Sequence, residues 1–124
     1  MKSATKITVL AVFSLSMLIA YGCASKKGTF GDPITESSVT SVGEILKNPA
    51  QFNKKTVLVN GKIIEECPTG GWFMLKDGSG IILVDLHPSY FAIPQAIGST
   101  ASAQGVVKSE GTRVSIVGKG VVLK

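Results

Sequence analysis

Cysteine and histidine are the residue types in this sequence that could bind a metal ion or supply a nucleophile. The chain of 124 residues contains two cysteines and one histidine. Cys67, with Glu66 before it, ends one apolar stretch and His87 follows another, so these side chains could meet at strand ends. A thiolate and an imidazole bind zinc or copper, but a structural zinc site needs four protein ligands and a catalytic site usually three. The sequence offers only two good donors, which is too few for either kind of site. We therefore interpret Cys67 as a turn cysteine and His87 as a solvated histidine, and keep a metal-linked or redox-linked role for the two residues as an alternative hypothesis.

Aromatic and basic side chains form a second set that could bind a ligand. Trp72 and Phe73 are neighbours, and successive strand residues point to opposite faces, so one of them points into the core and the other outward. The outward ring could stack on a base or a sugar, or it could pack under the loop that carries Tyr90. The candidate ligand-binding residues are Trp72, Phe73, Tyr90, Lys62 and Lys76.

The sequence gives little support for catalysis. No serine lies in a nucleophile elbow, and no glycine-rich phosphate loop follows a predicted strand. Cys67 would need a base within hydrogen-bond reach to act as a nucleophile, and His87 is the sole histidine. We expect Asp77 to cap its own turn. The sequence therefore predicts a protein that is not an enzyme and has no cofactor.

The first 22 residues have the order of regions found in a signal peptide. Lys2 and Lys6 precede an apolar run over residues 7–20, and Cys23 follows directly. The run of about 14 residues is shorter than the roughly 20 that a transmembrane helix needs. We predict a removable signal over residues 1–22.

Residues 19–23, Ile-Ala-Tyr-Gly-Cys, resemble a bacterial lipobox, in which the cysteine carries a thioether-linked diacylglycerol. The resemblance implies that Cys23 is lipidated and anchors the protein to a membrane by two or three acyl chains, more than the single chain that binds only marginally. Ala24, where an aspartate would indicate retention at the inner membrane, slightly favours the outer membrane. The other interpretation is an ordinary cleaved signal with an incidental Cys23. Residues 23–38 are predicted to be the lipidated cysteine and a flexible tether, because they mix small, polar and proline residues without periodicity.

The charge of the chain argues against a nucleic-acid ligand. Of 13 basic residues, Lys2 and Lys6 leave with the signal, so 11 remain against 8 acidic residues and the net charge is +3. The lysines are interspersed with acidic residues, whereas nucleic-acid-binding domains usually cluster their basic residues on one face. Binding of single-stranded nucleic acid stays a second hypothesis that export makes less favourable.

The remaining residues, 39–124, predict one short helix and five strands. Ser41 can cap a helix over residues 42–46 that Asn48 and Pro49 stop. A first strand over residues 56–64 alternates, with Gly61 suggesting a bulge or bend. Next comes a hairpin of residues 72–76 and 81–86, followed by a loop over 87–98 with room for one helical turn. The last two strands cover residues 100–107 and 113–117, and a tail could extend the second of them. Closing five short strands into a barrel removes their exposed edges, so we predict an oligonucleotide/oligosaccharide-binding (OB) barrel.

Three patterns in residues 41–124, "NP..F", "V.V.G.I" and "W..L.D.SG.I.V", are similar to those of OB-fold domains in small exported bacterial proteins. Some lipoproteins of this type carry a Cys-Pro-x-x-Gly-Cys-Trp stretch, and in this chain Gly71 stands at the second cysteine position. The resemblance therefore implies the fold and does not carry over a two-thiolate site. The combined expectation is a lipid-anchored, periplasm-facing binding module in the cell envelope, whose partner is the membrane together with an envelope protein, a glycan or a small ligand.

Overall fold

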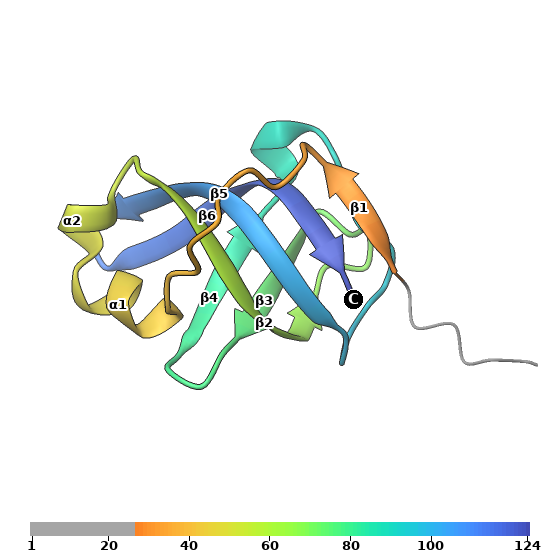
Figure 1. Cartoon of the computed structure of the whole chain (residues 1–124), viewed down its shortest axis with the longest axis horizontal. Coiled ribbons are helices and arrows are strands. Elements are labelled where there is room, and N and C mark those ends of the chain that lie inside the picture. Colours follow the sequence, from red (N-terminus) through yellow and green to blue (C-terminus); the bar gives the residue numbers. More distant parts are fainter. Residues whose placement is uncertain (1–26) are drawn as a thin grey trace, which may run out of the picture.

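A computed structural model describes residues 27–124, and its strands close into a barrel (Figure 1). The chain order is β1 (Gly28–Gly31), α1 (Val42–Lys47), α2 (Pro49–Phe52), β2 (Thr56–Glu66), β3 (Trp72–Lys76), β4 (Ile81–Asp85), the 3₁₀ turn η1 (His87–Ser89), β5 (Thr100–Glu110) and β6 (Arg113–Leu123). Around the barrel the order is β2, β3, β4, β6, β5 and back to β2, with β4 and β6 parallel and the other pairs antiparallel. The prediction of a mainly β, five-stranded, OB-fold-like barrel is confirmed.

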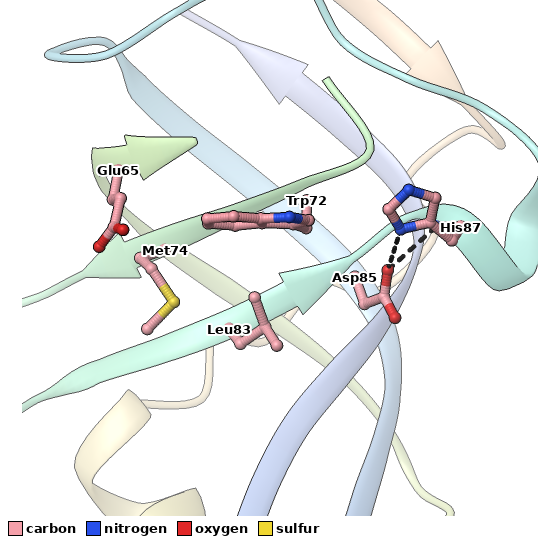
Figure 2. A pocket seen from close by; sticks show the side chains of 6 residues that line it. All are labelled: Glu65, Trp72, Met74, Leu83, Asp85 and His87. Carbon is pink, nitrogen blue, oxygen red and sulfur yellow. Dashed lines mark hydrogen bonds and ion pairs between the residues drawn. The ribbon is translucent and has the colours of Figure 1, made fainter. Parts of the chain in front are cut away.

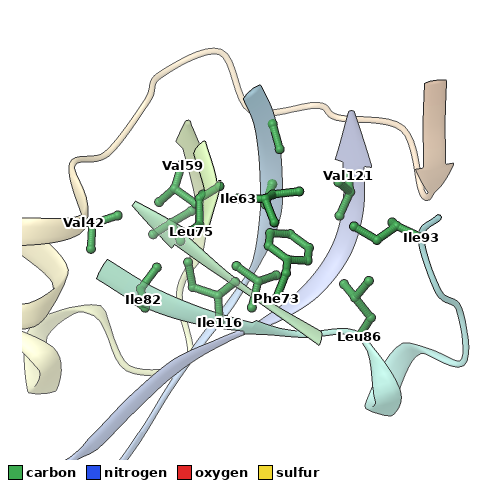
Figure 3. Packing of buried hydrophobic residues seen from close by; sticks show 14 of the residues in the cluster. Val42, Val59, Ile63, Phe73, Leu75, Ile82, Leu86, Ile93, Ile116 and Val121 are labelled. Atoms are coloured by element: carbon green, nitrogen blue, oxygen red, sulfur yellow. The ribbon is translucent and has the colours of Figure 1, made fainter. Parts of the chain in front are cut away.

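The barrel interior is filled by inward-pointing residues of every barrel strand (Figure 3). Val57, Val59 and Ile63, which alternation places on one face of β2, all point inward. Phe73 has no exposed surface and lies among side chains from the other strands. Leu58, on the opposite face of the strand from Val57 and Val59, is also only 7% exposed. The reason is that the chain before α1 runs over it, with Val39 bridging to Leu58.

Strand β2 bends where it passes from one neighbour to the next. A side chain at Gly61 would collide with the backbone carbonyl of Lys76, so this position needs glycine for a close backbone approach. The shift in register, however, falls between Ile63 and Glu65. The bulge therefore lies beyond Gly61.

The chain before α1 is packed against the barrel from Gly28 onward, although residues 23–38 were expected to be a tether. Strand β1 pairs with the end of β6. The buried side chain of Gln104 on β5 accepts hydrogen bonds through Oε1 from the backbone N–H groups of Thr35 (2.9 Å) and Glu36 (2.8 Å). These pairings join residues far apart in the sequence, so local composition could not reveal them. The predicted signal peptide, Cys23 and the first residues of the tether lie outside the described residues.

Helix α1 begins at its predicted cap, where the Ser41 hydroxyl accepts a hydrogen bond from the Glu44 N–H at 3.2 Å. The helix ends before Asn48 as expected, but Pro49 then begins the second short helix, α2, in the N-terminal position that proline tolerates. Strands β5 and β6 are longer than predicted, and the tail does extend the last strand. Within residues 27–124, no helix is long and apolar enough to cross a membrane.

The turn between β3 and β4 positions α1. Asp77 caps its own turn as predicted, with Oδ1 accepting hydrogen bonds from the N–H groups of Ser79 (2.7 Å) and Gly80 (3.0 Å). Its second oxygen, Oδ2, accepts a hydrogen bond from the Val42 N–H at 2.8 Å, and Ser79 Oγ accepts one from the Gly43 N–H at 2.7 Å. The turn therefore binds the free N–H groups at the start of α1, a contact absent from the sequence-based expectations.

Candidate functional site

A pocket of about 320 Å³ lies on the outer face of β3 and β4 (Figure 2). We call this surface the Trp72 face, and its lining residues are Glu65, Trp72, Met74, Leu83, Asp85 and His87. The strand registers explain why they gather, because Met74 lies opposite both Glu65 and Leu83, and Trp72 lies opposite Asp85. The outward side chains of three neighbouring strands thus form one surface.

Trp72 and Phe73 divide between the two sides of β3, as strand alternation requires. Phe73 is fully buried in the core, so it is not a ligand contact and leaves the candidate set. Trp72 is half-buried on the outer face, where its ring lies between Glu65 on one side and Asp85 with His87 on the other (Figure 2). It is the only tryptophan of the chain, so its fluorescence reports on this pocket alone.

Asp85 holds His87 at the rim of the pocket. Oδ1 of Asp85 lies 3.0 Å from Nδ1 of His87 and also accepts a hydrogen bond from the His87 N–H at 3.1 Å. Both side chains are partly exposed, so this pair fixes the orientation of the imidazole more than it stabilises the fold. Asp85 ends β4 and His87 begins η1, so the link spans a sharp change of chain direction.

The imidazole of His87 also covers Gly71, which stands where the similar lipoproteins carry a second cysteine. A Cβ atom at Gly71 would lie only 2.6 Å from Cε1 of the His87 ring. The buried Gly71 therefore makes room for the imidazole, and a larger side chain there would have to move His87.

Cys67 lies in the turn between β2 and β3, close to His87. Its Sγ lies 3.0 Å from Oγ1 of Thr69. The Thr69 hydroxyl, followed by the Thr69 N–H, lowers the pKa of the Cys67 thiol below its usual value; the Gly71 N–H and the charge of His87 act the same way, and burial opposes them. Within residues 27–124, no hydrogen bond joins the thiol to His87, and no group of three His, Cys, Asp or Glu side chains could hold a metal ion.

The other candidate residues lie around the Trp72 face but outside its pocket. Tyr90 is 96% exposed in a left-handed backbone conformation, and it lines a neighbouring hollow that shares His87 with the pocket. Lys62 and Lys76 are exposed and lie opposite one another on β2 and β3. The structure thus brings Trp72 and His87 together and leaves Tyr90, Lys62 and Lys76 beside them.

The sequence-based candidates omitted Glu65, Met74, Leu83 and Asp85 as contacts. Met74 and Leu83 are apolar residues at positions that alternate with core residues. This pattern could have predicted an apolar outer surface on β3 and β4. They also line a second hollow, of about 630 Å³, that continues across β6 to Arg113. The two hollows share Met74, Leu83 and Asp85, so one groove crosses β3, β4 and β6.

These features define an OB-fold-like barrel with a groove on the face of its second and third barrel strands, the face that binds ligands in this architecture. The chain is similar to the hypothetical protein ygiW from E. coli, with 28% identity and a TM-score of 0.56; the match covers 78% of this chain and 99% of that one. A chain described as an aspartyl-tRNA synthetase from Leishmania major Friedlin shares the fold at 17% identity and a TM-score of 0.50. That match covers 75% of this chain and only 23% of the synthetase chain. No protein-family model and no curated protein matches the chain.

Proposed function

We propose that this protein is a non-catalytic binding module that holds its ligand on the Trp72 face and is attached to the bacterial envelope through a lipid on Cys23. The half-exposed Trp72, which lines a groove together with Met74 and Leu83, carries the binding part of the proposal. Aromatic side chains on this face of OB folds provide stacking platforms. The similarity to ygiW, which covers nearly all of that chain, supports a protein built around this single barrel.

The Trp72 face has the composition of a recognition site. Its floor is apolar, from Trp72, Met74 and Leu83, and its polar groups lie at the ends, where they can orient a ligand. The helices α1 and α2 lie at the end of the barrel near the β3–β4 turn and leave this face uncovered (Figure 1). The Asp85–His87 pair lies at its edge, and the backbone N–H of Cys67 donates a hydrogen bond to the carbonyl of Trp72.

Binding at this face is tested with the fluorescence of Trp72. We expect one or more of three probes, chitotriose, a thymidine oligonucleotide and trilysine, to change the emission of Trp72 saturably. Leu83→Gln, which makes the floor polar without adding charge, should weaken that binding by about 1 kcal/mol, roughly fivefold. Ile97→Ala is the matched control, because Ile97 is exposed and does not line the pocket. Binding that leaves Trp72 emission unchanged and is insensitive to Leu83→Gln, or no binding of any probe, would contradict the proposal.

The anchoring part of the proposal rests on the sequence around Cys23 and is tested separately. In cells that express the full chain, we expect the protein to incorporate labelled palmitate and to sediment with membranes. Cys23→Ser should abolish the labelling and release the protein, because the thioether cannot form on serine. Cys67→Ser is the matched control and should keep both properties. Membrane association that persists unlabelled in Cys23→Ser would show that a lipid on Cys23 is not the anchor.

A further inference from the structure

We infer that the Trp72 face binds the positively charged side chain of a lysine in an extended peptide segment. This inference rests on the proposed function and assigns a chemical class to its ligand. The first observation is a local reversal of charge. After the predicted signal the chain carries 11 basic and 8 acidic residues, yet the pocket itself is lined by two carboxylates, Glu65 and Asp85, while the nearest lysines, Lys62 and Lys76, lie outside it.

Both carboxylates have oxygen atoms free to accept a hydrogen bond from a ligand. Within residues 27–124, no hydrogen bond or ion pair engages the side chain of the exposed Glu65. Asp85 uses Oδ1 for both of its contacts with His87, which leaves Oδ2 without a partner in the same part of the chain. The two groups lie at opposite sides of the Trp72 ring (Figure 2), so an ammonium group near either end meets a negative charge.

The floor between the carboxylates determines which kind of cation fits. The face of an indole ring attracts a cation, and the thioether of Met74 and the side chain of Leu83 offer contacts to an alkyl stem. A bare metal ion would gain nothing from the contacts that Met74 and Leu83 offer to an alkyl stem, and a phosphate group would be repelled by the carboxylates. An ammonium group on a four-carbon stem, as in lysine, matches both the floor and the ends.

The groove beyond the pocket favours a peptide over a free amine. It continues from Met74, Leu83 and Asp85 across β6 to Arg113, so it offers surface on one side of the pocket for a longer chain. An extended peptide that places one lysine over Trp72 can lay its neighbouring residues along this groove. A free diamine would fill only the pocket.

The test compares peptides that differ in one charge, using residues 24–124 and Trp72 emission. We expect the peptide acetyl-Leu-Lys-Leu-amide to bind saturably and its Nε-acetyl-lysine counterpart, which keeps the stem and loses the charge, to bind at least tenfold more weakly. Glu65→Gln should weaken binding of the lysine peptide severalfold, and Glu65→Gln with Asp85→Asn at least tenfold. Glu44→Gln, a matched loss of charge on the exposed side of α1, should have no effect. Unchanged thermal unfolding of Glu65→Gln shows that the loss is not a folding defect.

The outcomes separate this inference from the proposed function. Equal binding of both peptides, weakened by Leu83→Gln, would overturn the requirement for a charge and leave the Trp72 face as a binding site. A response of Trp72 to chitotriose or the oligonucleotide but to neither peptide would have the same meaning. Binding of 1,5-diaminopentane as tight as that of the peptide would overturn the peptide as occupant. The absence of a response to every probe would overturn both proposals.

Discussion

Replacing Phe73 by alanine is expected to lower the free energy of unfolding by about 3–5 kcal/mol. The ring has no exposed surface and packs against side chains from several strands, so its removal loses apolar burial and leaves a cavity that the closed barrel cannot collapse. Small domains are stable by only about 5–15 kcal/mol, so this loss is a large fraction of the total. Urea unfolding, followed by circular dichroism, measures it.

The neighbouring residue supplies the control for this prediction. Trp72→Ala should cost well under half as much, because the larger indole ring lies half-buried on the outer face. Where Phe73→Ala does not fold, Phe73→Leu gives a smaller loss that is still measurable. Equal losses for the two alanine variants would show that both rings belong to the core and would remove Trp72 from the proposed binding surface.

Replacing Asp77 by alanine is expected to cost roughly 2–3 kcal/mol, because its carboxylate accepts hydrogen bonds from two parts of the chain at once. It binds the Ser79 hydroxyl and the N–H groups of Ser79 and Gly80 within the β3–β4 turn, and the N–H of Val42 at the start of α1. Without the carboxylate, the first turn of α1 loses a partner and the turn loses its internal cap. Urea unfolding gives the loss in stability, and hydrogen exchange of the Val42 amide should accelerate.

The contribution of Asp77 should depend on pH in a defined direction. Burial raises the pKa of the carboxyl, but the hydrogen bonds from Ser79, Val42 and Gly80 outweigh it, so the folded-state pKa is lowered. A depressed pKa means that folding favours the ionised form. The stability is therefore fully present above the unfolded pKa of about 3.9 and is lost as pH falls through the folded pKa.

The corresponding measurement compares the wild type with Asp77→Asn and Asp77→Ala between neutral pH and strongly acidic pH. The stability gap between the wild type and each variant should be constant near neutrality and should narrow below about pH 4. Asp77→Asn keeps one acceptor oxygen and separates the effect of charge from that of shape. A gap that does not change with pH would show that the carboxylate acts in its neutral form or that its contacts are not formed.

Patterns between near neighbours in the sequence predicted most of the barrel. Strand alternation placed Val57, Val59 and Ile63 on one face of the first strand, and the structure shows that this face points inward. Ser41 was recognised as a helix cap because its partner lies three residues away. These signals depend on periods of two to four residues and need no knowledge of the rest of the chain. The lengths of β5 and β6 could not be predicted in this way, because each strand continues as far as its partner provides hydrogen bonds.

The candidate site was predictable only in part. The pair Trp72 and Phe73 was expected to have one outward ring, but alternation alone does not say which one, because that depends on how β3 lies between β2 and β4. The contribution of Glu65 follows from a bulge that re-aims its side chain toward Met74. A bulge of this kind is set by strand pairing, so no local pattern around Glu65 indicated its role.

The sequence by itself determined the class of fold, the placement of its turns, and the prediction of a lipid-bearing Cys23, because each depends on residue types within a short window. Only the tertiary structure decided that Trp72 shares a pocket with two carboxylates, that Gly71 lies under His87, and that Gln104 holds the chain before α1. Those contacts join residues distant in the chain, and closure of the barrel brings them together. The physical reason is that periodicity and turn chemistry are local, whereas pockets arise from the register of paired strands.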